Sequence, residues 1–253
     1  MTGNRPLGDF IRSRRARLSP DGSDPRRRRT PGLKREEVAE RAGISAEWYV
    51  KIEQGRIVTP SRDTVEALGR ALSLDAVDLA HLRVLASAGH RPPFRRETMP
   101  ETLHRLVANL PEPAYVTGQR WDILSWNDAA TALFGDFGDV AIPDRNILRW
   151  MLTDADAKAL FADGWHDEAH RMVSLFRAVH DLWVGDVAFA SLVDDLRDTC
   201  PEFGIWWAAH GIAAPTSGIK ALHHATRGPL RYAYASFQAN DDPALKLALY
   251  TVL

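Results

Sequence analysis

Residues 43–56 read GISAEWYVKIEQGR, which predicts one short helix between two glycines. Ser45 can accept a hydrogen bond from the free N–H groups of the first turn, and Gly55 can adopt the left-handed conformation that ends a helix. Tyr49 and Ile52 fall on one face at helical spacing. A helix this short is not stable alone, so this face must pack on a neighbour. The opposite face then stays available for another contact.

The sequence around this helix predicts a bundle of five short amphipathic helices. Ala39 is small enough for a close helix crossing, and Gly43 permits the positive φ of a three-residue turn. After the bundle, residues 91–100 are rich in Pro and Arg and have no periodic apolar face, so we expect a linker there between domains 1–90 and 101–253. The five expected helices are Leu7–Arg17, Lys34–Ala42, Ser45–Gln54, Ser61–Leu72 and Ala76–Ala88.

The charge of the chain is divided unevenly between its two parts. Residues 1–96 hold 20 Lys and Arg against 12 Asp and Glu, whereas residues 97–253 hold 12 against 21. A charge run is usually only a solvated surface. Here, however, 11 basic side chains fall within residues 5–35, among them the RRRR run at 26–29. Such a concentration beside a helical motif is typical of nucleic-acid binding.

Composition limits the class of protein further. The chain of 253 residues is 45% hydrophobic and 26% charged, which is the balance of a globular protein with room for two cores. Cys200 is the single cysteine, so an internal disulfide framework is excluded. The sequence shows no apolar run long enough for a membrane span. We therefore expect a cytoplasmic, nucleoid-associated protein without a membrane partner.

The stretch LKREEVAERAGISAEWYVKIEQGR, residues 33–56, resembles the helix-turn-helix of the Xre and phage-repressor family. The longer stretch that begins at the arginine run, together with the domain that follows, resembles the MmyB-like transcriptional regulators over nearly the full chain. The resemblance implies that the helix Ser45–Gln54 enters the major groove of DNA, where each base pair displays a distinct pattern of donors and acceptors.

The resemblance also implies which side chains read the bases. In phage-repressor-like domains these positions correspond here to Ala46, Glu47 and Lys51, with Arg35 at the start of the preceding helix. Arg35 replaces the glutamine common at that position. Its contact is therefore either to a phosphate or to guanine.

Other residues are expected at the DNA backbone. Trp48 has two open interpretations, because tryptophan serves equally well against sugar and phosphate or packed on the fourth helix. The arginine run directly precedes the DNA-facing helices, so we favour a backbone or minor-groove arm over a solvated loop. The expected backbone contacts are Ser45, Arg56 and Arg62, which lie at helix edges, and Arg27 and Arg28 from the arm.

The second part of the chain reads as an α+β domain. Residues 113–137 predict a strand, a tight turn at Gly118, a second strand and a helix that begins at Asn127 or Asp128. Helical spacing dominates the middle, and alternating or apolar strands separated by RGP and NDDP turns close the chain. This order, ending in an antiparallel sheet, is that of a PAS-like domain, and the opening resembles the ligand-binding half of MmyB-like proteins.

Such a domain can enclose an apolar cavity. Seven of the eight tryptophans lie in this half, although aromatic residues more often belong to a core than to a ligand site. The resemblance implies a ligand of fatty-acid type. The residues that we expect to line the pocket are Trp126, Phe134, Trp150, Phe176, Trp206 and Trp207.

Enzymatic and metal-dependent interpretations have weaker support. HDEAH at 166–170 places two histidines four residues apart, but Asp167 replaces the catalytic glutamate of H-E-x-x-H and no third ligand is evident. His223 and His224 are adjacent on an expected strand and point to opposite faces. We therefore expect neither a metal nor a cofactor, and no catalytic residues.

Together these features predict a ligand-responsive, sequence-specific DNA-binding regulator, with release of a repressor by an apolar ligand as the favoured mode. One short helix reads only a few base pairs, so we expect a homodimer on a near-palindromic operator. The alternative is a DNA-binding protein whose second domain is a dimerisation or partner-binding module, or a DNA-tethered enzyme.

Overall fold

The computed structural model describes residues 4–19, 32–56, 59–87 and 92–253. The chain divides into two compact units, which are treated separately below. Unit 1 comprises residues 1–92 with 181–184, and unit 2 comprises residues 93–180 with 185–253.

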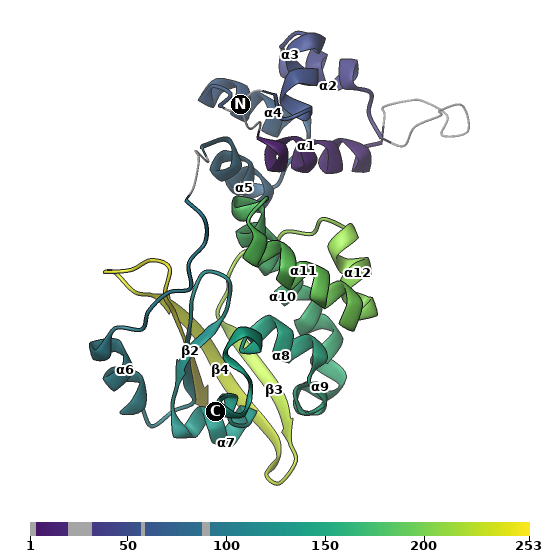
Figure 1. Cartoon of the computed structure of the whole chain (residues 1–253). Helices are drawn as coiled ribbons and strands as arrows, with labels where there is room; N and C mark the ends of the chain where they lie inside the picture. Colours follow the sequence, from purple (N-terminus) through teal and green to yellow (C-terminus); the bar gives the residue numbers. More distant parts are fainter. Residues whose placement is uncertain (1–3, 20–31, 57–58, 88–91) are drawn as a thin grey trace. The chain divides into compact units, whose positions relative to one another are not determined.

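The described part of unit 1 is helical, as the sequence predicts (Figure 1). Each of the five expected helices is present, with ends that differ from the expectation by no more than two residues. Helix α1 contacts both α3 and α5, and α2 packs on α3 and α4. The helices are α1 (Arg5–Arg17), α2 (Arg35–Ala42), α3 (Ala46–Glu53), α4 (Arg62–Ala71) and α5 (Ala76–Ser87).

The turn between α2 and α3 follows from local chemistry. Gly43 ends α2 with φ of 66°, a left-handed conformation that glycine adopts without a Cβ clash. Ser45 then caps α3, because its Oγ accepts a hydrogen bond from the backbone N–H of Trp48 at 3.1 Å. Tyr49 and Ile52 are completely buried and anchor α3 in the core.

Helix α1 crosses α3 at very short range. A Cβ atom on Gly8 would lie 2.4 Å from the backbone oxygen of Glu53, a distance that real Cβ atoms do not adopt. Only glycine at this position therefore permits the crossing. Leu7 and Ile11, on either side of it, are completely buried.

Unit 2 is built on a five-stranded antiparallel sheet. The strand order is β2-β1-β5-β4-β3, so the last strand of the chain lies between the first hairpin and the second. This arrangement confirms the expected α+β domain that closes with an antiparallel sheet. The strands are β1 (Ala114–Thr117), β2 (Ile123–Trp126), β3 (Gly218–His224), β4 (Gly228–Gln238) and β5 (Lys246–Val252).

Helices cover the two faces of this sheet unequally (Figure 1). Helix α6 (Glu101–Ala108) lies on one face, where Val107, Ala114 and Val116 form a buried cluster. The other side carries the remaining helices of unit 2: α7 (Asp128–Phe134), α8 (Ile147–Thr153), α9 (Ala155–Phe161), α10 (Trp165–His180), α11 (Val187–Thr199) and α12 (Pro201–Ala208), with the short 3-10 turns η2 (Phe137–Asp139), η3 (Ile142–Asp144) and η4 (Ala162–Gly164). A further 3-10 turn, η5 (Asp181–Trp183), belongs to unit 1.

The β2 to α7 transition is fastened by Asn127, which is buried. Its Oδ1 accepts hydrogen bonds from the N–H groups of Ala114 at 3.1 Å and Ala130 at 2.9 Å. Its Nδ2 donates to the carbonyls of Leu110 and Glu112. One side chain thus caps α7 and ties it to the residues before β1.

The segment before α6 is held against the rest of unit 2 by several contacts. The N–H of Phe94 donates to Asp186 Oδ2 at 2.7 Å, and the Arg96 guanidinium donates to the carbonyls of Ile123 and Ile142. Met99 packs on the cluster under α6. Residues 93–100, which the sequence suggests as part of a linker, are therefore packed as part of unit 2.

Candidate functional site

The exposed face of α3 carries the residues expected to read DNA bases. Ala46, Glu47 and Trp48 are exposed in the first turn of the helix, and Lys51 follows one turn later. Lys51 Nζ lies 2.7 Å from Glu47 Oε1. This hydrogen bond, together with the charge of Lys51, lowers the pKa of Glu47. The two side chains therefore present a balanced pair to solvent.

The opposite side of α3 is fixed by a buried carboxylate that sequence reasoning missed. The side chain of Glu53 has no exposed area. Arg15 of α1 donates to it through Nε at 2.8 Å and through a terminal nitrogen at 3.1 Å. Arg35 of α2 donates through Nε at 2.8 Å. Glu53 thus joins three helices. The signal for it in the sequence was an acid four residues after Tyr49, which places it on the buried side of the helix.

The ionisation of Glu53 reflects two opposing effects. Burial disfavours the charged carboxylate, but hydrogen bonds from Arg15 and Arg35 outweigh burial and lower the pKa of Glu53. The phenol of Tyr49 has a pKa raised by burial and by the neighbouring Glu53 carboxylate. Both groups therefore keep their ordinary charge at neutral pH.

Arg35 is consequently held at the surface in a defined position. Its side chain is 41% exposed while its Nε is bound to Glu53. A guanidinium carries further N–H donors, so Arg35 can contact Glu53 and a phosphate or guanine at the same time.

The residues expected at the DNA backbone lie at helix edges of unit 1. Arg56 is exposed just after α3, and Arg62 is exposed as the first residue of α4. The Ser45 hydroxyl is engaged in capping α3. Trp48 is 40% exposed, so much of its indole lies on the surface. Arg27 and Arg28 lie outside the described residues.

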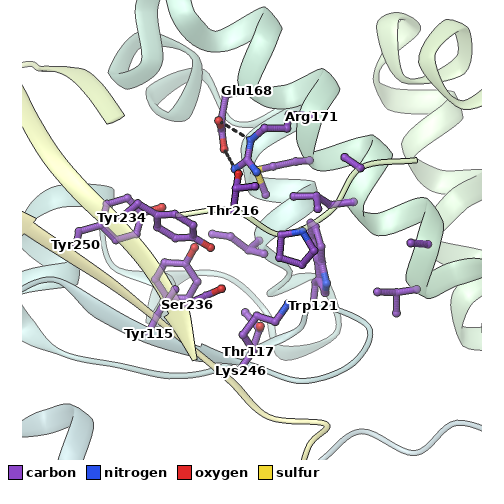
Figure 2. A pocket seen from close by; sticks show the side chains of 18 residues that line it. Tyr115, Thr117, Trp121, Glu168, Arg171, Thr216, Tyr234, Ser236, Lys246 and Tyr250 are labelled. Atoms are coloured by element: carbon purple, nitrogen blue, oxygen red, sulfur yellow. Dashed lines mark hydrogen bonds and ion pairs between the residues drawn. The ribbon is translucent and has the colours of Figure 1, made fainter. Parts of the chain in front are cut away.

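Unit 2 contains a cavity of about 150 Å³ between the sheet and α10. Figure 2 shows Tyr115, Tyr234 and Tyr250 gathered on one side, with Trp121 across from them. Apolar side chains complete most of the wall. The lining residues are Tyr115, Thr117, Trp121, Ile147, Glu168, Arg171, Met172, Leu175, Ala178, Val179, Ala213, Pro215, Thr216, Tyr234, Ser236, Lys246, Ala248 and Tyr250.

One end of the cavity holds an ion network. Glu168 on α10 accepts hydrogen bonds from Arg171 at 2.8 and 3.2 Å and from Lys220 on β3. Burial opposes ionisation of Glu168, but these partners lower its pKa overall. The Lys220 ammonium also lies over the ring of Tyr234. Two cations of the protein therefore already share this carboxylate.

The six aromatic residues expected to line the ligand pocket lie outside this lining. Phe134 and Trp150 pack edge to face with ring centroids 5.6 Å apart. Phe176 is completely buried, and its ring lies 6.2 Å from that of Trp207. The remaining two are Trp126, which packs on Phe137, and Trp206, which packs on Trp165. Large rings fill space by packing on one another, so these six belong to aromatic clusters, in which Trp126 and Trp150 are partly exposed and the other four are buried. The cavity is bounded by other side chains.

The histidine motif at 166–170 is arranged around an aromatic residue. The rings of His166 and His170 lie 5.0 and 5.5 Å from the ring of Trp206. In the described part of the chain, no three His, Cys, Asp or Glu side chains are grouped so that they could share a metal ion. Cys200 is buried, and burial raises the pKa of its thiol.

Comparison with known families agrees with both halves of this arrangement. A family described as "Helix-turn-helix domain" matches residues 6–82. A family described as "MmyB-like transcription regulator ligand binding domain" matches residues 99–253, which is more than half of the chain. The chain belongs to the MmyB-like transcription regulators. No curated protein matched the sequence.

The two family matches of this MmyB-like regulator correspond to its two units. Unit 1 carries the helix-turn-helix, and unit 2 carries the ligand-binding fold with the cavity. The chain is therefore a ligand-responsive transcription regulator that binds DNA. Among the helices that the structure describes, none combines the length and apolar character needed to cross a bilayer.

Proposed function

We propose that this regulator is a repressor that leaves its operator when an apolar ligand of fatty-acid type binds to unit 2. The observation that carries the proposal is an exposed face on α3, held by Glu53, in a chain that also contains a partly open, mostly apolar cavity. The DNA would be chromosomal, in the cytoplasm. Binding would bias two arrangements of the protein, with a coupling of about 1 to 3 kcal/mol in operator affinity.

The DNA contacts proposed for α3 can be tested on the full chain with an operator selected from random duplexes. Lys51→Ala should weaken binding to the selected operator and leave random DNA nearly unaffected, because a base contact discriminates between sequences. Arg62→Ala is the matched control and should weaken both kinds of DNA alike. Fluorescence anisotropy over a salt series measures both. Equal loss on both DNAs for Lys51→Ala would show that α3 does not read bases.

The sensing step is tested by measuring operator affinity with and without saturating fatty acid. A repressor of this kind should bind its operator about 5- to 150-fold more weakly in the presence of the ligand. Unchanged affinity would refute this ligand and favour the alternative, in which unit 2 serves as a dimerisation or partner-binding module.

We propose further that the regulator is a homodimer, because one recognition helix reads too few base pairs for a unique operator. The sheet face opposite the cavity supports a contact between copies. Ile219 is 57% exposed and Phe237 is 55% exposed, and both lie on this face beyond the cluster under α6. Ala233 lies directly opposite Ile219 on β4, so small and apolar side chains continue the surface.

Light scattering of the full chain tests the dimer. Phe237→Asp should produce a monomer, because it places a charge within the proposed apolar contact. Val187→Asp is the control, since Val187 is 81% exposed but lies on α11, away from the sheet. A wild-type chain that is monomeric with and without DNA would overturn this proposal.

A further inference from the structure

The dimensions and chemistry of the cavity point to a narrower class of ligand. A closed apolar cavity of about 150 Å³ in a protein interior takes up benzene. The cavity of unit 2 is partly open, but the space within it is of similar volume. The tyrosines and Trp121 offer ring faces and edges for an aromatic partner, and offset or edge-to-face packing adds to simple burial. The volume of about 150 Å³ holds about one ring, so the rest of a long acyl chain would have to lie outside it, through the open side of the cavity.

The charges of the lining indicate the sign of the ligand. The charged residues of the lining are Glu168, Arg171 and Lys246. Glu168 is already shared by Arg171 and Lys220. Lys246 is half-buried, and its ammonium has no hydrogen-bond or ion-pair partner among the described residues. Burial alone lowers the pKa of Lys246, and no carboxylate acts in the other direction.

Lys246 also lies where hydroxyl groups converge. In the sheet it is directly opposite Thr117, and both side chains line the cavity. Ser236 on β4 lines the same space. Figure 2 shows Thr117 and Lys246 at one end of the cavity, with Glu168 and Arg171 at the other end. An ammonium with neighbouring hydroxyls is a suitable site for a carboxylate.

Trp121 supplies a second sign that this space is built for an occupant. It has φ of 69°, a left-handed conformation that is costly for a bulky residue. The tight turn that contains it is closed by a hydrogen bond from its N–H to the carbonyl of Gly118 at 3.1 Å. Its ring lines the cavity and packs on Phe176. Strain of this kind is concentrated at functional sites.

We propose that the cavity binds a compact aromatic monocarboxylate of the size of phenylacetate, with its carboxylate on Lys246 and its ring between Trp121 and the tyrosines. The inference rests on the proposed function, since it names the ligand of the sensing unit. It narrows the apolar ligand of that function to an acid whose apolar part is a ring that fits within the cavity.

The test uses calorimetric titration of the full chain with phenylacetate, with the uncharged analogue phenylacetamide, and with palmitate. The wild type should bind phenylacetate more tightly than phenylacetamide. Lys246→Met should weaken phenylacetate about 10- to 100-fold, because it removes a charge-assisted contact, and should leave phenylacetamide unchanged. Lys158→Met is the matched control, since Lys158 is exposed on α9 outside the lining, and it should change neither ligand.

The following outcomes of the titrations and the operator measurement would refute the compact aromatic ligand. Equal affinity for phenylacetate and phenylacetamide would remove the role of Lys246, as would a Lys246→Met variant with wild-type affinity. Parallel measurement of operator affinity separates the two proposals. Release from the operator by palmitate, without binding of phenylacetate, would refute the compact ligand and leave the repressor intact. An operator affinity that no acid changes, together with an absence of binding, would refute both.

Discussion

Replacement of Glu53 by glutamine should destabilise unit 1 far more than its small change in shape suggests. The Glu53 carboxylate has no exposed area and receives hydrogen bonds from Arg15 and Arg35. Glutamine keeps one acceptor oxygen but removes the negative charge. The Arg15 side chain, which is itself largely buried, would then carry an unbalanced positive charge.

The magnitude follows from the burial of the partners. Removing one member of a buried ion pair costs about 3 to 5 kcal/mol. Arg35 is partly exposed, so water replaces part of its contact, and the retained amide oxygen recovers one hydrogen bond. We therefore expect the low end of this range, about 3 kcal/mol in the free energy of unfolding of unit 1. This corresponds to roughly 100-fold faster exchange for amides that exchange only when the unit unfolds.

Hydrogen exchange with mass spectrometry on the full chain measures this directly, because peptides from α1 to α4 report on unit 1 alone. Glu66→Gln is the control: Glu66 also pairs with an arginine, Arg83, but at the surface, so exchange should remain at the wild-type rate. If Glu53→Gln exchanged no faster than Glu66→Gln, the buried carboxylate would not be what holds the helices together.

The stabilisation of unit 1 by Glu53 should also depend on pH, with a definite sign. The pKa of Glu53 is lowered below its ordinary value of 4.5, so its contribution to stability is present above that value and is lost as the pH falls through the lower folded pKa. The difference in exchange between wild type and Glu53→Gln, compared at equal pH, should therefore shrink below about pH 4.5. A difference that stayed constant into strong acid would contradict the assigned charge.

Three further substitutions or reactions test separate features. Gly8→Ala should lower the melting temperature of unit 1 more than Gly43→Ala. The new methyl group at Gly8 would meet the Glu53 backbone, whereas a methyl group at Gly43 has open space and costs only about 1 kcal/mol for the left-handed φ. Equal shifts in melting temperature would show that the crossing of α1 and α3 is not close. Asn127→Ala should destabilise unit 2 by about 2 to 4 kcal/mol in urea unfolding, since several buried backbone groups lose their partner, and a loss below 1 kcal/mol would contradict this. Cys200 should resist iodoacetamide in the native chain and react on unfolding, and rapid native alkylation seen by mass spectrometry would argue against its burial.

The helix boundaries were predictable because their causes are local. Ser45 and Asn127 each cap a helix by accepting a hydrogen bond from a backbone N–H only three residues further along the chain. Gly43 ends α2 through its own φ. The residues that make such interactions lie within a few positions of each other in the chain, so a sequence pattern can predict them.

The lining of the cavity was not predictable in the same way. Lys246 reaches it because β5 pairs with β1, which joins residues near the two ends of the unit in one register. The sequence does show Lys246, Ala248 and Tyr250 on one face of the strand, so a charge at an inward position was the available signal. The abundance of tryptophan indicated burial, but it did not indicate which rings would pack on one another and which would border an empty space.

The two sides of α3 can change independently over evolution. Tyr49, Ile52 and Glu53 face the rest of unit 1 and determine whether the helix is held at all. Ala46 and Lys51, on the other side, have no buried role in the fold. If α3 reads the operator as we propose, a duplicated gene could acquire a new set of operators by substitutions on the outer side alone, without passing through an unstable intermediate. Under the same proposal, α3 is the place to redirect the protein to a chosen promoter, provided that Tyr49, Ile52 and Glu53 are left untouched.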